Sequence, residues 1–476
     1  MMEREQFRRT KIVCTIGPRT NSSDRILQLI NAGMDVARLN FSHGDHEAHR
    51  QTIRLIRALS RRAGKEVGIL QDLGGPKIRL GDIKGNKKVL IHGEKVTLFA
   101  GQSSEDDAIP VNYAEFVRDI EVGNVILLAD GTVQLLAVEK QNEKVVCEVI
   151  VGGIVLSHKG VNLPLSHLSV KAFTDKDRAD LELGMAEKVD FVALSFVRSL
   201  KDLEEIREVM NQAARPPMLI AKIEKPQAVE NFEEILRAVD GVMVARGDLG
   251  VEMPLEEIPM IQKRIIRMTR QAGKPVITAT QMLTSMLENP RPTRAEATDV
   301  ANAILDGTDA LMLSDETAMG NYPLEAVSTL DKIAKSTERY LKDIDFLKED
   351  VSEFLHTVPA GISRAACFLA RDLEASAIVA SSSSGSTARL VARFRPLAPI
   401  IALTDRVEAL RHLALSWGVI PHLVSSFLDT DQMFATARAW AIERGVAKAG
   451  DCLVITAGVP VGVSGTTNLL KVMEIT

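Results

Sequence analysis

Eight short apolar runs that alternate with helix-period stretches constrain the fold of this chain more than any other feature. Strands that alternate with helices predict parallel βαβ units, and eight such units predict an α/β chain closed as a (β/α)8 TIM barrel. An open doubly wound sheet is the alternative, but no GxGxxG fingerprint follows the first run. The runs are Lys11–Gly17, Val36–Phe41, Val67–Leu70, Phe191–Phe196, Met218–Ile223, Gly241–Ala245, Pro275–Thr280 and Ala310–Leu313.

The alternation is interrupted once, by a segment rich in β-type runs and in Gly, Asn and Asp turns. This pattern of short β-type runs separated by turns predicts an inserted, mostly antiparallel β-domain. Beyond the charged stretch Lys342–Glu353, strand-like runs at Ala377–Ala380, Pro399–Leu403 and Cys452–Thr456 alternate with helical patterns and predict a third, α/β domain. The predicted organisation is a barrel over residues 1–75 and 171–345, a β-rich insertion over 76–170, and a C-terminal α/β domain over 346–476.

Composition excludes several classes of partner. The net charge of -5 gives no reason to expect nucleic acid or an anionic membrane. The four cysteines show no CxxC spacing, which favours free thiols in a reducing compartment over a disulfide framework. The N-terminus lacks the apolar region of a secretory signal, and no run of about 18 apolar residues is present. We therefore expect a cytoplasmic protein.

Polar and charged side chains follow the apolar runs at unusual density. In a barrel the strand ends meet at the C-terminal face, where the active site lies. One such residue is typically a salt bridge or a helix cap, but clusters at five or more strand ends are better explained by a shared site. The candidates are Arg38, Asn40, Ser42, Asp72, Lys222, Glu224, Arg246, Asp248, Thr280, Ser314 and Glu316.

The residue types suit metal-assisted chemistry on a phosphate. Glu224 and Asp248 follow consecutive strands, and two carboxylates completed by water and substrate oxygens suit Mg²⁺ or Mn²⁺. Lys222 lies two residues before Glu224, on the same side of an extended segment, where it can stabilise charge on a phosphoryl group or an enolate. Arg38 offers a planar fork for phosphate. A buried ion pair is the alternative for Lys222 and Glu224.

Long, ordered motifs around these positions resemble those of the pyruvate kinases. The resemblance implies a Mg²⁺-dependent, allosterically regulated homotetramer that moves a phosphoryl group between phosphoenolpyruvate and ADP, giving pyruvate and ATP in the final step of glycolysis. The insertion would be a lid that closes over the nucleotide and excludes water. The matching stretches are TKIVCTIGPRT, DVARLNFSHG, GPKIRLG, KGVNLP, IAKIEKPQAVEN, VMVARGDLGVE, TATQMLTSM, PRPTRAEATDVANAILDGTDALMLSDETAMGNYP, ARFRPLAPIIALT and GVSGTTN.

The resemblance also implies a role for each strand-end residue. Arg38 would contact the phosphate of phosphoenolpyruvate, and Lys222 would stabilise the transferring phosphoryl group and the enolate. Glu224 and Asp248 would hold the metal. The further implied groups are Gly247, Asp248 and Thr280 for substrate binding, Thr280 and Ser314 for proton relay, and Asn40, His43, Arg79 and Lys159 for the nucleotide.

One departure from the family pattern concerns potassium. Many members need K⁺, whose ligands would fall at Asn40, Ser42, Asp72 and the Leu73 carbonyl. Those members read DTKGPEIR where this chain reads DLGGPKIR, so Lys77 replaces a glutamate. A fixed ammonium can replace the charge of a bound cation, and we predict that K⁺ is not required. The alternative is a lysine that points to solvent beside a working K⁺ site.

A serine-rich stretch in the C-terminal domain is the candidate effector site. Hydroxyl and N–H groups at the start of a helix bind phosphate, and the resemblance places a sugar-phosphate effector here. A lysine frequent in fructose-bisphosphate-activated members is Ser383 in this chain, which favours a monophosphate such as ribose 5-phosphate or AMP. A serine-capped helix without ligand is the alternative. The candidate phosphate contacts are Ser382, Ser383, Ser384, Ser386 and Thr387.

Two other function classes remain open from the sequence. A metal-dependent aldolase or lyase also stabilises a pyruvate enolate on such a barrel, but it has no use for the nucleotide contacts Arg79 and Lys159. A regulatory binding protein that lost activity is the non-enzyme alternative. Retention of Lys222, Glu224 and Thr280 argues against it.

Overall fold

A closed barrel of parallel strands forms the centre of the molecule, in the order β1-β16-β15-β14-β13-β12-β3-β2. The computed structural model describes residues 7–104, 107–164, 166, 168–348, 356–460 and 466–476. The predicted barrel fold is confirmed. Its strands are β1 (Lys11–Thr15), β2 (Val36–Asn40), β3 (Gly68–Asp72), β12 (Phe191–Leu194), β13 (Met218–Ile223), β14 (Gly241–Ala245), β15 (Val276–Ala279) and β16 (Ala310–Leu313).

A layer of helices surrounds the barrel. Helix α10, for example, begins with a capping box in which Thr293 and Glu296 satisfy each other's backbone N–H groups, and it buries Val300, Ala303 and Ile304. Among the described residues, no helix has both the length and the apolar character needed to cross a bilayer. The helices of this layer are α1 (Ser23–Ala32), α2 (His46–Ala63), α4 (Asp175–Ala186), α5 (Lys201–Met210), α6 (Pro226–Glu230), α7 (Phe232–Ala238), α8 (Arg246–Glu252), α9 (Ile258–Gln271), α10 (Arg294–Leu305), α11 (Asp315–Ala318) and α12 (Pro323–Glu338).

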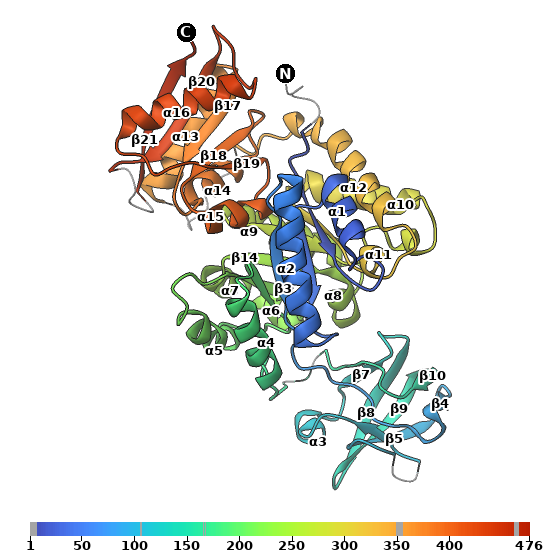
Figure 1. Cartoon of the computed structure of the whole chain (residues 1–476). Helices are drawn as coiled ribbons and strands as arrows, with labels where there is room; N and C mark the ends of the chain where they lie inside the picture. The colour runs from blue at the N-terminus through green and yellow to red at the C-terminus, as the bar shows by residue number, and fades with distance from the viewer. Residues whose placement is uncertain (1–6, 105–106, 165, 167, 349–355, 461–465) are drawn as a thin grey trace.

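The β-rich insertion forms a separate lid domain that projects from one end of the barrel, opposite the C-terminal domain (Figure 1). It contains a sheet of order β11-β7-β8-β9-β5-β6 and a two-stranded ribbon, β10-β4. Alternate residues of β8 and β9 are buried in its own core, as expected for an antiparallel sheet with one wet face. Its elements are β4 (Lys87–Leu90), β5 (Lys95–Ala100), β6 (Ile109–Val111), α3 (Phe116–Asp119), β7 (Val125–Leu128), β8 (Val133–Gln141), β9 (Lys144–Val151), β10 (Gly153–Leu156) and β11 (Val161–Asn162).

The C-terminal α/β domain has a sheet of order β19-β18-β17-β20-β21, in which only β21 runs antiparallel. The sequence predicted the three inner strands and missed the two at the edges. Both edge strands are largely half-buried or exposed, and β19 carries Pro421, which an edge strand tolerates. The elements are α13 (Val358–Asp372), β17 (Ala377–Ser381), α14 (Ser386–Ala392), β18 (Ile400–Thr404), α15 (Val407–His412), β19 (Val419–Leu423), α16 (Thr430–Glu443), β20 (Cys452–Gly458) and β21 (Thr467–Glu474).

A segment of the C-terminal domain closes the base of the barrel. Ala414 and Leu415, on the short helix η5 (Leu413–Leu415), belong to the same buried cluster as the inward-facing residues of the barrel strands. Beside them, the buried Lys11 ammonium donates to the Val419 carbonyl at 2.9 Å. The apolar core of the barrel therefore continues into the C-terminal domain, and the two domains share part of one core.

Leu415→Ala should therefore destabilise the whole molecule. Leu415 is fully buried, and emptying such a site costs about 2–5 kcal/mol. The matched control is Leu428→Ala, at a leucine that is 89% exposed, where we expect a change within about 0.5 kcal/mol. Urea unfolding followed by circular dichroism measures both. A Leu415→Ala protein as stable as the control would show that the packing of Leu415 against the barrel does not contribute to the free energy of unfolding.

Candidate active site

One buried lysine joins three strand ends at the C-terminal face of the barrel. The Lys222 ammonium lies 2.8 Å from Glu224 Oε1 and 3.2 Å from Asp72 Oδ1. It also donates a hydrogen bond to Ser195 Oγ at 2.7 Å. An ammonium has three N–H donors, so each has an oxygen partner within reach and the charge is held in a defined position.

Arg38 is fixed beside this lysine. Its Nε lies 2.7 Å from Asp72 Oδ2, and its Nη1 donates to Thr15 Oγ1 at 2.9 Å. Asp72 therefore bridges the guanidinium and the ammonium of Lys222. Two cations held by one buried carboxylate form a clamp suited to a phosphate group.

The charges of this cluster stabilise one another. Burial would lower the pKa of Lys222, but Asp72 and Glu224 outweigh it and hold that pKa above its usual value. Burial would raise the pKa of Asp72, yet Lys222 and Arg38 hold it below its usual value. Burial, together with the nearby charge of Asp248, outweighs the effect of Lys222 on Glu224 and raises its pKa. Lys222 and Asp72 are thus charged at neutral pH.

Helix α8 begins where β14 ends and carries Asp248 at an exposed position of its first turn. The neighbouring Arg246, which the sequence placed among the strand-end candidates, serves another purpose. Its guanidinium lies 2.6 Å from Asp299 Oδ2 on α10 and donates to the Thr280 carbonyl at 2.8 Å. Arg246 therefore ties the start of α8 to α10 and to the loop after β15, and it does not join the Lys222 cluster.

Thr280 and Gly247 lie against each other in a strained segment. The Gly247 N–H donates to Thr280 Oγ1 at 2.7 Å. Thr280 and Gln281 have φ values of 66° and 53°, a region that costs a β-branched residue energy and that concentrates at functional sites. A Cβ on Gly247 would lie 3.3 Å from Thr280 Oγ1, so glycine permits this close approach.

Ser314 and Glu316 follow β16 with different surroundings. Ser314 Oγ is buried and has no hydrogen-bond partner among the described residues, which leaves a hydroxyl available to substrate or water. The Glu316 carboxylate instead accepts from the Ser314 and Leu283 N–H groups at 2.8 and 3.0 Å. Glu316 therefore supports the loop, whereas Ser314 offers a reactive group.

Comparison with known families settles which enzymes share this arrangement. The family model of the pyruvate kinase barrel domain matches residues 7–327, and that of the pyruvate kinase alpha/beta domain matches residues 360–473. The chain belongs to the pyruvate kinase family. The resemblance predicted from the motifs is confirmed, and the aldolase or lyase alternative is set aside.

Individual pyruvate kinases match over nearly the full chain. The enzyme of Geobacillus stearothermophilus is 48% identical over 98% of this chain and 80% of its own length. The enzyme of Clostridium acetobutylicum is 44% identical over 98% of this chain and 100% of its own. The crystal structure of a pyruvate kinase from Cryptosporidium parvum superimposes with a TM-score of 0.93 at 36% identity, covering 100% of this chain and 98% of that one.

In this pyruvate kinase fold, three of the four predicted K⁺ ligands, Asn40, Asp72 and the Leu73 carbonyl, already have protein partners. Asn40 Oδ1 accepts from the Ser42 N–H at 3.1 Å, and the Leu73 carbonyl accepts from Ser195 Oγ at 2.7 Å. The carboxylate of Asp72 is paired with two cations, as described above. Lys77 is exposed at the mouth of the adjoining cleft and forms no ion pair among the described residues.

The cleft between lid and barrel has a volume of about 380 Å³. Arg79 and Lys159 line it from the lid side, opposite Asp248 of the barrel. Asn40 and His43 do not line the cleft. The pKa of His43 is nevertheless lowered, first by partial burial and then by the nearby charges of Lys77 and Arg79. The structure therefore gathers Arg79 and Lys159 near the metal candidate Asp248.

The serine-rich stretch forms the turn before α14. Ser384 Oγ donates to Ser386 Oγ at 3.0 Å, and Gly385 caps the helix with φ 74°. The hydroxyl of Thr387 is buried and hydrogen-bonded to Thr467 Oγ1 at 2.6 Å, so it faces the domain interior. Residues 462–465, the first four of the GVSGTTN stretch, lie outside the described residues.

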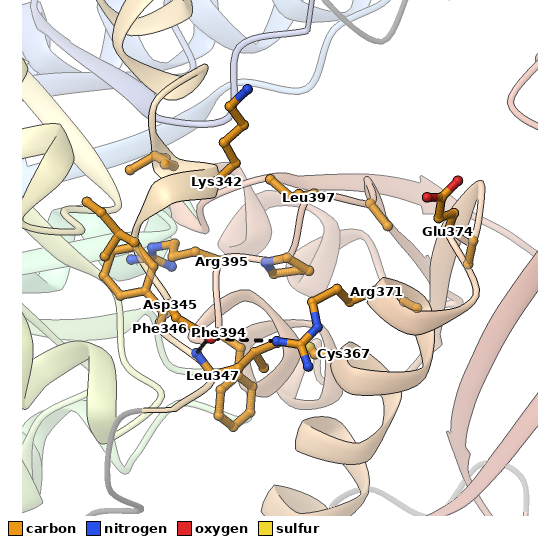
Figure 2. A pocket seen from close by; sticks show the side chains of 16 residues that line it. Lys342, Asp345, Phe346, Leu347, Cys367, Arg371, Glu374, Phe394, Arg395 and Leu397 are labelled. Atoms are coloured by element: carbon orange, nitrogen blue, oxygen red, sulfur yellow. Dashed lines mark hydrogen bonds and ion pairs between the residues drawn. The ribbon is translucent and has the colours of Figure 1, made fainter.

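A larger cavity of about 480 Å³ lies between the end of the barrel and the C-terminal domain. Figure 2 shows Arg371 directed toward Asp345, with 3.7 Å between Nη1 and Oδ2. Phe346 and Phe394 contribute apolar surface. None of the residues predicted from the sequence lines this cavity.

Sequence reasoning missed Ser195 and Thr15, which orient Lys222 and Arg38. Both are polar residues at or just after the end of a barrel strand, β12 and β1 respectively. That position was the signal used for the other candidates, and it would have found them. Their partners, however, follow only from the order of the strands around the closed barrel.

Proposed function

We propose that this enzyme transfers the phosphoryl group of phosphoenolpyruvate to ADP at the C-terminal face of the barrel, giving pyruvate and ATP as the last step of glycolysis. The observation that carries the proposal is the Lys222 ammonium, held 2.8 Å from Glu224 and 3.2 Å from Asp72 beside the Arg38 guanidinium. Two fixed cations next to two acidic groups suit a reaction in which negative charge moves between oxygens.

The donor set fits Mg²⁺ or Mn²⁺. Glu224 is buried near Asp248 and its pKa is raised by burial and by that neighbour, so a divalent cation held by both carboxylates would relieve their repulsion. Among the described residues, no three His, Cys, Asp or Glu side chains gather around a possible ion. Water and substrate oxygens would complete the shell, as is usual for Mg²⁺. The bound ion would neutralise charge on the phosphoryl oxygens.

The side chains would divide the chemistry among them. Arg38 and Lys222 stabilise the transferring group while its bond to the enol oxygen breaks and a bond to an oxygen of ADP forms. Gly247 and Thr280 lie at the substrate carboxylate. The enolate that leaves then takes a proton at its methylene carbon, relayed by the Thr280 and Ser314 hydroxyls. Closure of the lid excludes water as a competing acceptor.

Lys222→Met should lower kcat by about 10²- to 10³-fold, because the ammonium stabilises charge that develops in the transition state. The KM for phosphoenolpyruvate should change little. A coupled assay of ADP-dependent pyruvate formation measures both, and Lys335→Met, at a surface ion pair of α12, is the control. A variant with near-normal kcat and much weaker substrate binding would contradict the role, and pyruvate formation without ADP would contradict the reaction.

We further propose that K⁺ is not required. Asp72 is already neutralised by Arg38 and Lys222, and the exposed Lys77 adds a third positive charge beside the cleft. The pKa of Lys77 is lowered mainly by partial burial and, after that, by the nearby charges of Arg79 and Lys222. These fixed charges would replace the electrostatic contribution of a bound monovalent cation.

Turnover in tetramethylammonium buffer should therefore equal turnover in K⁺ buffer within about twofold, since the fixed charges are present in both. Lys77→Glu should restore a K⁺ requirement. Initial rates at matched ionic strength decide the matter, with Lys88→Glu on the far side of the lid as the charge control. A loss of about tenfold or more in tetramethylammonium, which corresponds to about 1.4 kcal/mol, would contradict the proposal.

Regulation and assembly rest on the family resemblance alone. We propose a monophosphate effector, ribose 5-phosphate or AMP, at Ser382, Ser383, Ser384 and Ser386, and a cytoplasmic homotetramer. Thr387, the fifth residue predicted for this site, is left out because its hydroxyl is buried against Thr467. Effector binding should lower the concentration of phosphoenolpyruvate needed for half-maximal rate, which an activity screen with each compound measures. Fructose 1,6-bisphosphate as the stronger activator would overturn the monophosphate assignment, and light scattering of a dimer would overturn the tetramer.

A further inference from the structure

A buried carboxylate connects the lid to the barrel at the end of α8. The side chain of Glu252 is only 1% exposed. Its Oε1 accepts from the Lys225 ammonium at 2.5 Å and from Asn162 Nδ2 at 2.8 Å. Its Oε2 is buried and has no hydrogen-bond partner among the described residues. One oxygen therefore holds together three segments that are far apart in the sequence.

The barrel side of this contact belongs to the metal-binding segment. Lys225 directly follows Glu224, and its ammonium lies 5.3 Å from the centre of the Phe196 ring. The Phe196 N–H in turn donates to Glu224 Oε2 at 2.8 Å. Glu252 itself lies one helical turn beyond Asp248 on α8. The carboxylate is thus rigidly related to both proposed metal ligands.

The lid side of the contact belongs to the nucleotide-binding segment. Asn162 lies on β11, three residues after Lys159. Gly160, which directly follows Lys159, forms a β-bridge with Arg79. Holding Asn162 therefore holds the backbone that carries both cations proposed to face the nucleotide phosphates.

Helix α8 also lies close to the lid at a second point. A Cβ placed on Gly131, in the turn between β7 and β8, would lie 3.5 Å from Val251 Cγ1, which is ordinary van der Waals contact. The end of α8 therefore lies close to the lid at Val251 as well as at its neighbour Glu252. The Asn162–Glu252 hydrogen bond is the charged part of that contact.

We propose that Glu252 is a positioning residue that fastens the lid to the barrel and sets the distance between the nucleotide-facing cations and the metal-binding carboxylates. The proposal rests on the function proposed above for Lys159, Arg79 and Asp248. A merely structural ion pair would support the fold of α8 and Lys225 without affecting the lid. The two roles differ in what the loss of the Asn162 contact does.

Asn162→Ala removes the lid's donor and leaves the Lys225–Glu252 pair intact. We expect the KM for ADP to rise about tenfold, the size of effect of a hydrogen bond to a charged acceptor, while the KM for phosphoenolpyruvate and the melting temperature stay near wild type. Hydrogen exchange of β7 and β11 should become faster. Gln141→Ala is the control, since Gln141 lies at the far end of the lid and its side chain bonds only to Glu139 among the described residues.

Glu252→Gln tests the other partner. The neutral amide can still accept from Asn162, but the buried Lys225 loses its counter-charge, so binding of ADP should weaken here too. Both changes act on one contact. The double variant, Asn162→Ala with Glu252→Gln, should therefore bind ADP no more weakly than whichever single variant binds it more weakly. Effects that multiply, or an Asn162→Ala protein that matches Gln141→Ala in KM and exchange, would overturn the proposal. If Glu252→Gln does not fold, Asn162→Ala still decides.

Binding of Mn²⁺ to the free enzyme, followed by electron paramagnetic resonance, separates this inference from the proposed function. Asn162→Ala should keep wild-type Mn²⁺ affinity, whereas Asp248→Asn should lose most of it. Unchanged Mn²⁺ affinity in Asp248→Asn would refute the metal assignment but would leave the conclusion about the lid contact unaffected. Loss of affinity in Asn162→Ala would refute a contact that acts on the lid alone.

Discussion

The active face depends on one buried charge cluster, the Lys222 ammonium between the Asp72 and Glu224 carboxylates. Through Asp72 the cluster reaches Arg38, and through Ser195 it reaches the end of β12. The strands that contribute, β2, β3, β12 and β13, are neighbours in the barrel order. A buried charge that loses its partner is costly, so these contacts hold four adjacent strand ends in one arrangement and leave the cations in place before any substrate arrives.

The two ends of the barrel perform different tasks. At the base, the strands pack against Ala414 and Leu415 of another domain in a dry apolar cluster. At the opposite face, Thr280 and Phe196 adopt positive φ values, and Ser314 Oγ has no partner among the described residues. Strained and unsatisfied groups persist only where the surrounding structure over-determines them. The apolar base supplies that support, because the strands that end in the site begin in the buried cluster that Ala414 and Leu415 complete.

Much of this architecture was predictable from the sequence because the barrel strands are largely buried and read as apolar runs with a polar residue at or just after the end. The edge strand β21 was missed because its side chains are mostly half-buried or exposed, which leaves only a weak pattern. The position of a strand-end residue also does not reveal which way its side chain points. Arg246 turns toward Asp299, and the partners of Glu252 lie in segments that only the closed barrel and the docked lid bring together.

The lid contact must satisfy two opposed requirements. In its proposed role it would orient Arg79 and Lys159 closely enough to hold a nucleotide, yet it would have to break on every cycle to admit ADP and release ATP. A single amide donor on a buried carboxylate, Asn162 on Glu252, meets both, since such a bond contributes about 1.5–3 kcal/mol. That energy favours the docked lid by roughly ten- to a hundredfold and still permits opening on the microsecond to millisecond timescale of domain motions. The ion pair with Lys225 would hold the acceptor in place while the lid is undocked.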